Sequence, residues 1–492
     1  MSRWQFGSYA RRFGFGGLVL VGLTYLACNA QPAGAEEWAQ FRGANASGVS
    51  QQSKNLPVKF SHEEKVLWSA ELGEGIGCPI VSGGRVFSTS MVGDETFAVF
   101  CFDAASGETL WKKELDTGPL PAIMPPNTQA SSTPAADGDR VYVYFSTLGI
   151  MAFDAASGER LWTTPVSLPF YLLGWGAAHS PIIHDDMVIF NQDDDLAPFL
   201  LALDKYTGEV RWRTERSDML AGYAVPVVCE ADGQVDIVIA GSGKLQGYDP
   251  QTGKERWTCN TLLRTIMTTP AVVGEKIYVA VQSYGDTNRV LKYALLQWKD
   301  TNQDSKLDKT EVDEAFWEKF DNGDKDKDGF LVEDEIDVAF QSPNNRVGGG
   351  NIIQAIKGGG KGDVTKTHIV WNLDNKSPSN IASPLVAYDQ VFVVKKGGIS
   401  ASFDAETGET RWMKKRIRNL GNYYASPIAG DGKIYVTGEN GFIVVLSNEG
   451  PKPKVLAKND MGEPCIATPA IADGRIFVRT LNKLYCFSEE AQ

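Results

Sequence analysis

The sequence predicts an all-β protein, an eight-bladed β-propeller closed by its N- and C-terminal strands, with a small α-helical insert. Two repeated patterns carry this prediction. In the first, an apolar strand leads through Asp-x-x-Ser/Thr-Gly into a strand that ends in tryptophan, with copies ending at Trp111, Trp162, Trp212, Trp257 and Trp412. In the second, a Ser/Thr-Pro step precedes an alternating strand, as in ASPIAGDGKIYV. Together they describe a four-stranded unit that recurs every ~40–50 residues, which is typical of a propeller blade.

The turn residues of the first pattern predict a hairpin. In the copy FDAASGERLW, the Asp154 carboxylate and the Ser157 hydroxyl can hydrogen-bond to the turn backbone. Gly158 can adopt a positive φ because it has no Cβ atom. We therefore expect a hairpin with a glycine bulge in each copy.

The number of outer strands predicts eight blades. Seven outer strands end at the five tryptophans above, at Trp371 and near Leu456. The last strands of the chain have no outer strand after them, but residues 65–71 near the N-terminus supply one. Pairing the two termini closes the ring and removes exposed sheet edges, which would otherwise promote aggregation.

One irregular spacing reveals an insert. Trp257 and Trp371 are 114 positions apart, which leaves roughly 65–70 residues beyond one ordinary repeat. The insert falls between the second and third strands of the fifth blade. The predicted division of the chain is a signal peptide (1–35), an N-terminal extension (36–64), propeller blades 1 to 5 (65–285), the insert (286–346) and blades 5 to 8 (347–492).

The N-terminus predicts export. Three arginines precede an apolar run (13–27), and Ala33-Gly34-Ala35 provides a small-x-small cleavage site. We therefore expect a periplasmic or cell-envelope protein. Leu26-Ala27-Cys28 partly resembles a bacterial lipoprotein processing box, so lipidation at Cys28 stays open as the alternative, and membrane attachment is expected only in that case.

The charge is concentrated in the insert. The net charge is −13, and residues 300–340 contribute −10 of it through fifteen acidic residues and five lysines. The remaining chain shows no basic stripe, so nucleic acid is not an expected partner.

Six of the seven cysteines would remain after removal of residues 1–35. They fall two to a repeat, which permits the disulfides Cys78–Cys101, Cys229–Cys259 and Cys465–Cys486. Buried free thiols are the alternative, and the composition favours them.

Two acidic segments of the insert have the pattern of calcium-binding loops. Both resemble EF-hands, in which alternating acids at positions 1, 3 and 5, a carbonyl at 7 and a bidentate Glu at 12 surround the ion. The first set of ligands is Asp300, Asn302, Asp304, the Lys306 carbonyl and Glu311, with Asp308 at the position that often binds through water. The second set is Asp324, Asp326, Asp328, the Phe330 carbonyl and Glu335. The pattern predicts two calcium sites, and a solvated acidic insert is the alternative.

Two departures from the EF-hand pattern have physical consequences. Ser305 replaces the glycine at position 6 of the first loop, so we expect backbone strain and weaker binding there. Only residues 312–323 separate the loops, which allows one short helix instead of two.

A binding surface is expected where long aromatic loops converge. In a blade, the loop between strands two and three and the connection to the next blade emerge on the same face. The predicted surface residues are Asn127, Trp175, His179, Tyr223, Arg416, Tyr423 and Tyr424. The alternative is that these rings only cover the ends of the blades.

Catalytic motifs are scarce. The chain has four histidines, no HExxH pair and no GxSxG elbow, and no Ser-His-Asp triad can be placed. The glycine-rich runs 347–350 and 358–362 lack the Walker pattern and are interpreted as hinges around the insert. The sequence therefore favours a protein that is not an enzyme.

The Asp-Ser/Thr-Gly-Trp repeat resembles that of the pyrroloquinoline-quinone (PQQ) repeat family over residues 65–487. The resemblance implies an eight-bladed propeller. It leaves two branches open, the quinoprotein alcohol and glucose dehydrogenases and a non-catalytic branch typified by the outer-membrane β-barrel assembly factor. The start Trp38-Ala39-Gln40-Phe41-Arg42-Gly43 further resembles exported bacterial PQQ-like proteins, some of which carry EF-hands.

The dehydrogenase branch is the less suitable comparison. Its alcohol dehydrogenases typically have a disulfide between adjacent cysteines beside the cofactor, and this chain has no Cys-Cys pair. Their base Asp and calcium-binding Glu and Asn also match no motif here. We therefore predict an exported calcium-binding propeller that acts as a non-catalytic binding or scaffold module, with a protein or cell-envelope partner and no PQQ. The alternative is a PQQ-dependent quinoprotein dehydrogenase with an atypical site.

Overall fold

The computed structural model describes residues 36–491 with gaps at 172–173, 218, 220–221, 261–266, 283–298, 313, 340–350, 375, 377–380, 419 and 449–451. The predicted signal peptide (1–35), including Cys28, lies outside the described residues. So do the predicted insert boundaries at 286 and 346 and the glycine run 347–350.

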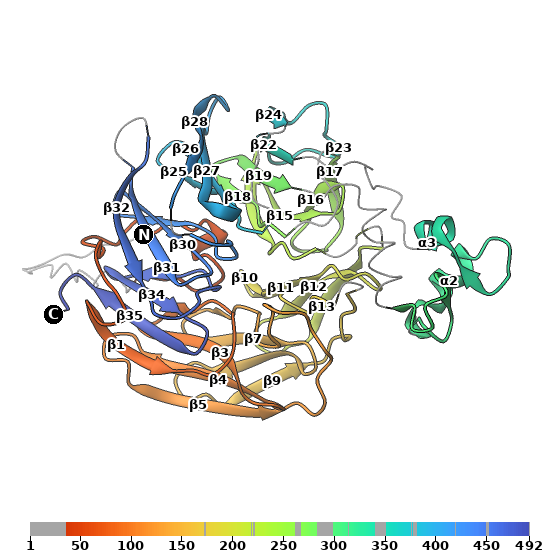
Figure 1. The fold of residues 1–492 in the computed structure, drawn as a ribbon, viewed down its shortest axis with the longest axis horizontal. Coiled ribbons are helices and arrows are strands. Elements are labelled where there is room, and N and C mark those ends of the chain that lie inside the picture. The colour runs from red at the N-terminus through yellow and green to blue at the C-terminus, as the bar shows by residue number, and fades with distance from the viewer. Residues whose placement is uncertain are drawn as a thin grey trace, which may run out of the picture. The chain divides into compact units, whose positions relative to one another are not determined.

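Eight antiparallel blade sheets follow one another around a common axis, as the sequence predicts (Figure 1). Blade 1 contains β2 (Ile80–Ser82), β3 (Arg85–Gly93), β4 (Thr96–Asp103) and β5 (Thr109–Asp116). Blade 2 contains β6 (Ala135–Ala136), β7 (Arg140–Phe145), β8 (Gly149–Asp154) and β9 (Arg160–Thr164). Blade 3 contains β10 (Ile182–His184), β11 (Met187–Gln192), β12 (Phe199–Asp204) and β13 (Val210–Glu215). Blade 4 contains β14 (Val227–Ala231), β15 (Gln234–Gly241), β16 (Lys244–Tyr248) and β17 (Glu255–Cys259).

The second half of the ring has the same order. Blade 5 contains β18 (Ala271–Val273), β19 (Lys276–Gln282), β22 (Asn351–Lys357) and β24 (Ile369–Asp374). Blade 6 contains β25 (Leu385–Ala387), β26 (Gln390–Lys395), β27 (Ile399–Asp404) and β28 (Thr410–Arg416), with η3 (Lys396–Gly398) between β26 and β27. Blade 7 contains β29 (Ile428–Gly430), β30 (Lys433–Thr437), β31 (Phe442–Ser447) and β32 (Lys454–Asp460). Blade 8 contains β33 (Ala470–Ala472), β34 (Arg475–Arg479), β35 (Lys483–Ser488) and the N-terminal β1 (Val66–Glu71).

The predicted closure of the ring is confirmed. Strand β1 pairs antiparallel with β35, with Trp68 opposite Cys486 and Glu71 opposite Lys483. Figure 1 shows β1 and β35, from opposite ends of the chain, side by side. One short strand, β23 (Gly362–Asp363), was not predicted, and it adds to blade 4 by pairing parallel with β17.

The hairpin turns form as their sequence predicts. The Asp154 carboxylate accepts hydrogen bonds from the Ser157 backbone N–H (2.7 Å) and from the Ser157 hydroxyl (2.8 Å). Both hydrogen bonds lower the pKa of Asp154, and the bond from the Ser157 backbone N–H has the larger effect. Gly158 has φ +69°, and the register of β8 and β9 shifts by one residue at Phe153, which is the expected bulge.

Each turn glycine also joins neighbouring blades. The Trp111 indole of blade 1 lies against Gly158 of blade 2 and donates its Nε1–H to the Ala155 carbonyl at 3.0 Å. The same arrangement recurs where Trp68, Trp162, Trp212 and Trp371 meet Gly107, Gly208, Gly253 and Gly408. Apolar side chains of adjacent blades fill the space between sheets, so the core is a series of inter-blade layers.

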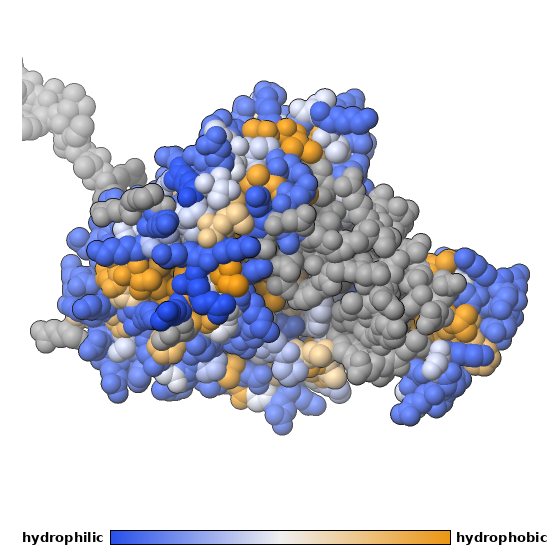
Figure 2. All heavy atoms as spheres, turned by 45° about the horizontal axis from the view of Figure 1, so that its top comes forward, coloured by the Kyte–Doolittle hydropathy of each residue, from blue (hydrophilic) through white to orange (hydrophobic). Residues whose placement is uncertain are grey.

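The insert follows β19 and precedes β22. Its described part contains β20 (Leu307–Asp308), η2 (Glu314–Phe316), α2 (Trp317–Gly323), β21 (Phe330–Leu331) and α3 (Glu333–Ala339). Figure 2 shows that its surface is mostly hydrophilic, in keeping with its acidic composition.

The six cysteines that the structure describes are buried and free, so the alternative of free thiols is correct. Within the described part of the chain, no helix has the length and apolar character needed to cross a membrane.

Candidate functional site

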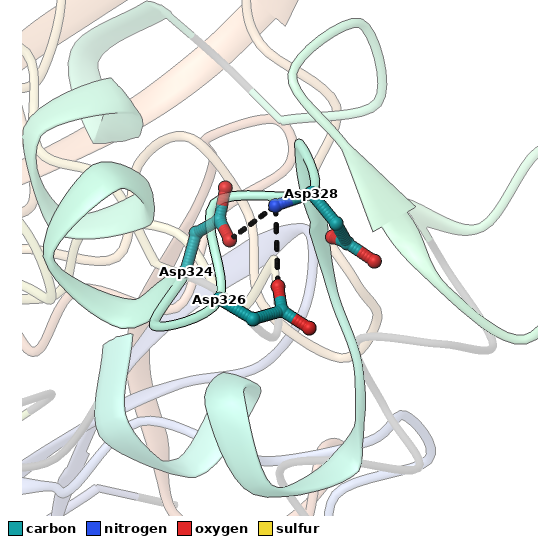
Figure 3. Close-up of side chains that lie close together, drawn as sticks. All are labelled: Asp324, Asp326 and Asp328. Atoms are coloured by element: carbon teal, nitrogen blue, oxygen red, sulfur yellow. Dashed lines mark hydrogen bonds between the residues drawn. The ribbon is translucent and has the colours of Figure 1, made fainter.

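The two acidic loops of the insert have matching geometry. In the second loop, the Asp328 backbone N–H donates to Asp324 (3.2 Å) and to Asp326 (3.1 Å), and one carboxylate oxygen from each of the three aspartates lies within 4.8 Å of the others (Figure 3). Glu335 accepts from the Lys325 N–H at 3.0 Å and from the Val332 N–H at 3.2 Å. The carboxylates at loop positions 1, 3 and 5 therefore lie around one small volume, and the position-12 carboxylate of Glu335 is tied to the backbone of the same loop.

The first loop repeats the same bonds. The Asp304 N–H donates to Asp300 (3.1 Å) and to Asn302 (2.9 Å), and Glu311 accepts from the Thr301 N–H at 2.8 Å. Asp308 accepts from the Thr310 N–H at 2.7 Å, so its carboxylate caps the turn before Glu311. The candidate metal ligands of both loops are oxygen atoms, which hard cations such as Ca²⁺ prefer. The residues therefore fit this ion.

The predicted strain at Ser305 is present in the backbone. Ser305 has φ +64°, in the left-handed region that Gly329 occupies with φ +86° in the second loop. Replacing Ser305 with glycine is expected to relieve about 1 kcal/mol and to raise the calcium affinity of the first loop by up to about fivefold. Calcium titration of the two proteins by calorimetry measures this change. Gly329→Ser is the matched reverse substitution, and an unchanged affinity in both variants would contradict the argument.

A short sheet and an apolar cluster link the loops. Leu307 pairs with Leu331 across β20 and β21, as their position-8 placement predicts. Their side chains are buried in a cluster completed by Val312, Phe316, Phe320, Ile336 and Ala339. The two loops are therefore one packed unit.

This cluster also contacts the propeller. The Phe316 ring packs edge-on against Phe170, with centroids 4.3 Å apart, and Leu196 packs on the same cluster. Lys319 donates to the Asp195 carbonyl at 2.6 Å, and burial lowers its pKa. The insert thus rests on the connection between blades 2 and 3 and on the β11–β12 loop.

An axial cavity of about 330 Å³ is bounded by the predicted aromatic loops. Asn127, Trp175, Tyr223 and Tyr424 line it, together with Pro125 and Pro126. The Asn127 side-chain amide donates to the Trp175 carbonyl at 2.7 Å, which joins two of the inter-blade connections. These four predicted residues are therefore brought together, and all belong to connections between blades.

The other three predicted surface residues lie elsewhere. His179 is 1% exposed and stacks behind Tyr223, with ring centroids 5.7 Å apart, and burial lowers its pKa to about 3. Its Nε2 atom contacts the Tyr171 hydroxyl. Tyr423 is 3% exposed within the core between blades 6 and 7. Arg416 is exposed at the end of β28, away from the cavity lining. The prediction that His179 and Tyr423 lie on an accessible surface is therefore wrong, because both rings are needed to fill space between elements.

A belt of small residues surrounds the cavity and was not predicted from the sequence. It consists of the residue before the proline in each blade, namely Cys78, Thr133, Ser180, Val225, Thr269, Ser383, Ser426 and Thr468. Each belt residue lies two positions before an innermost strand, and the proline that follows it favours an extended backbone there. The recurring Ser/Thr-Pro step was the available signal, but the repeat pattern alone does not show that these side chains meet on one axis.

The belt is hydrogen-bonded from blade to blade. The backbone N–H of one belt residue donates to the side chain of the next, for example from Thr133 to Ser180 at 3.0 Å and from Ser426 to Thr468 at 2.9 Å. The Thr468 N–H closes the circle by donating to the Cys78 Sγ at 3.2 Å. Seven of the eight steps are made in this way, and the step from Ser180 to Val225 lacks an acceptor because valine has no hydroxyl.

Substitutions in the belt are expected to change stability in opposite directions. Thr468→Val leaves the buried Ser426 N–H without its acceptor and should lower the free energy of unfolding by about 1–2 kcal/mol. Val225→Thr supplies the missing acceptor and should raise it by up to about 1 kcal/mol. Thermal unfolding of both variants checks the pair. A loss in both would show that packing, and not the hydrogen-bonded belt, determines stability at these positions.

The described cavity lining does not fit PQQ. It contains no Asp, Glu, His, Lys or Arg side chain, so it offers no acid that could hold a calcium ion beside the cofactor. Burial raises the pKa values of Cys78 and Tyr223, which keeps both groups neutral. The aromatic rim of Trp175, Tyr223 and Tyr424 is suited to a neutral aromatic or apolar surface.

The blades, their turn-and-tryptophan joints and the belt define a propeller of the PQQ-like repeat class. The chain belongs to the family described as outer membrane protein assembly factor BamB, whose profile matches residues 49–172, 98–324 and 347–450.

Individual relatives come from both branches. Outer membrane protein assembly factor BamB of Shewanella oneidensis is 23% identical over 434 residues, which cover 83% of this chain and 96% of that protein. Quinoprotein ethanol dehydrogenase of Pseudomonas aeruginosa is 34% identical over 148 residues, only 26% of this chain and 22% of that enzyme. The crystal structure of BamB from Moraxella catarrhalis superposes with a TM-score of 0.54 at 15% identity, covering 87% of this chain and 98% of that one, and supports the shared fold.

Proposed function

We propose that this protein is an exported, calcium-binding propeller that acts as a non-catalytic binding or scaffold module in the cell envelope. The observation that carries the proposal is the axial cavity, rimmed by Trp175, Tyr223 and Tyr424, which has no Asp, Glu, His, Lys or Arg side chain in its described lining. Half-buried aromatic side chains on inter-blade connections are suited to hold a partner. The match over most of the length of a protein named as an outer membrane assembly factor supports an envelope role.

Bound calcium would keep the insert folded and packed against Phe170 and Leu196 of the propeller. Asp324, Asp326, Asp328 and Glu335, with the Phe330 carbonyl, are the proposed ligands of one ion, and the matching residues of the first loop would hold a second. Bound calcium stabilises the folded insert by RT ln(1 + [Ca²⁺]/Kd). Because the Phe316 side chain of the insert packs on Phe170, next to the Tyr171 ring that stacks on Tyr223 at 5.1 Å, the loaded insert supports the rim of the cavity.

Site-specific cross-linking tests the partner surface. A photoreactive residue replaces Trp175 or Tyr424 in the full chain, and the exposed Leu110 of outer strand β5 provides the control position. We expect a discrete envelope protein to be cross-linked from the two rim positions and not from position 110, with a weaker product after calcium chelation. Equal products from all three positions, or none from the rim, would refute the proposed surface.

The second candidate is a PQQ-dependent dehydrogenase, favoured by the 34% identity to quinoprotein ethanol dehydrogenase over part of the chain. Titration of the protein without residues 1–35 with PQQ and calcium, followed by a dye-linked alcohol oxidation assay, tests it. We expect no saturable binding and no turnover. Turnover that scales with bound PQQ would replace the scaffold proposal.

A further inference from the structure

The N-terminal segment 36–50 closes the ring opposite the cavity mouth. It contains the 3-10 turn η1 (Ala44–Ala46) and contacts the innermost strands of four blades. The contacts are Trp38 with Val81 of β2, Ala39 with Ala136 of β6, Asn45 with Val228 of β14, and Ser50 with Ala429 of β29. Because blades 1, 2, 4 and 7 surround the axis, a segment that touches all of them crosses it. Phe41 of this segment lines the axial cavity.

Arg42 is the next residue in this segment, and its charge is fully buried. The side chain is 0% exposed. One terminal nitrogen donates to the Pro384 carbonyl at 2.8 Å and to the Ser47 carbonyl at 3.4 Å. The Nε and the other terminal nitrogen have no hydrogen-bond partner, and no carboxylate of the described residues forms an ion pair with this guanidinium. Burial lowers the pKa of Arg42 to about 9.

A second buried arginine adds to the same charge imbalance. Arg479 is 0% exposed and donates to the Ser88 hydroxyl at 3.0 Å, to the Ser90 hydroxyl at 2.9 Å and to backbone carbonyls, but to no carboxylate of the described residues. Cys78, a belt residue, is the titratable group whose electrostatic interaction with both guanidiniums is resolved. Two positive charges thus lie near one belt position without an acidic partner among the described residues. An unpaired buried charge is strongly unfavourable, so a counter-ion is expected.

The belt supplies further donors. Six belt residues have a hydroxyl that accepts a backbone N–H. The hydroxyls of Thr133 and Thr468 also hydrogen-bond to the Cys78 side chain. The O–H hydrogens of the other four can donate toward the cavity that the belt lines. Arg42 lies beside this belt because its acceptor, the Pro384 carbonyl, belongs to the residue after the belt member Ser383. The unpaired guanidinium donors and these four hydroxyl donors together are complementary to a negatively charged acceptor.

We propose that a small anion, a halide, an oxyanion or a carboxylate, binds on the propeller axis between Arg42 and the hydroxyl belt. It neutralises the buried guanidinium and forms the floor of the axial cavity. This role explains why the motif Trp38-Ala39-Gln40-Phe41-Arg42-Gly43 combines a buried aromatic anchor with a cation. The inference is independent of calcium and of the scaffold proposal.

Bromide is the probe in the decisive experiment, because its anomalous scattering locates it in a crystal. The protein without residues 1–35 is crystallised with sodium bromide, and its melting temperature is followed from about 1 to 100 mM bromide at constant ionic strength with a bulky organic anion. We expect an anomalous peak beside the Arg42 guanidinium and a rise of several degrees in melting temperature. The absence of both in the wild-type protein would overturn the proposal.

Three variants test whether a bound anion or the Cys78 thiolate balances the buried charge. Arg42→Gln should abolish the bromide dependence, whereas the exposed control Arg213→Gln should retain it. If Arg42→Gln does not fold, the wild-type crystal and melting data still decide. Cys78→Ser should leave bromide binding intact, and if it creates bromide binding that the wild type lacks, the Cys78 thiolate is the counter-ion and the proposal is overturned. Displacement of bromide by acetate would show that the site accepts a ligand carboxylate, and binding that acetate does not displace would assign it to an inorganic anion.

Discussion

Replacing Asp324 and Glu335 with alanine is expected to remove one of two calcium ions while the propeller stays folded. Asp324 provides loop position 1, and Glu335 provides the two oxygens at position 12. Removing both takes away three donor oxygens and two negative charges, so binding at the second loop should fall below detection at millimolar calcium. Calorimetry measures the stoichiometry, and far-ultraviolet circular dichroism measures the retained β-structure.

The control for this variant changes charge without changing a loop. Glu108 and Glu159 are exposed acids of two hairpin turns, and their double alanine variant loses the same formal charge. Its calcium stoichiometry should equal that of the wild type. An unchanged stoichiometry in the Asp324/Glu335 variant would remove the basis for the calcium site, while the propeller fold would be unaffected because the insert only interrupts blade 5.

Gly158→Ala is expected to lower the free energy of unfolding by about 3 kcal/mol, a large loss for the addition of one methyl group. A Cβ at this position would lie 2.6 Å from the Trp111 ring and 2.8 Å from the Lys113 side chain, and the φ of +69° is unfavourable for alanine. The tryptophan cannot retreat without losing its hydrogen bond to Ala155 and its place between blades 1 and 2. A lower melting temperature and denaturation midpoint would show the effect.

A matched glycine separates steric overlap from backbone strain. Gly233 has nearly the same φ, +73°, but a Cβ there would meet nothing within 4 Å. Gly233→Ala should therefore cost only about 1 kcal/mol, the contribution of the left-handed backbone. Equal losses in the two variants would show that the tryptophan–glycine joint does not hold the blades together.

The periodic features were predictable because they depend on neighbours in the chain. The bulge at Gly158, the tryptophan of every outer strand except that of blade 7 and the pairing of β1 with β35 follow from turn chemistry, strand alternation and the need to cover sheet edges. The prediction that these strands end at the tryptophan is wrong, because the tryptophan is the third residue of its strand and the pairing continues beyond it. The donor order of the two acidic loops is local in the same sense, since twelve consecutive residues provide each set.

The sequence by itself therefore determined the eight blades, the closure and the candidate calcium ligands. Only the tertiary structure decided what meets at the axis. The eight belt residues are spread over residues 78–468, and their side chains become neighbours only when the ring closes. Arg42 looks like an ordinary surface arginine in the sequence, but it is buried because the N-terminal segment crosses the ring. Similarly, His179 and Tyr423 lie in the interior because space between packed blades must be filled. Such contacts between distant segments leave no periodic trace in the chain.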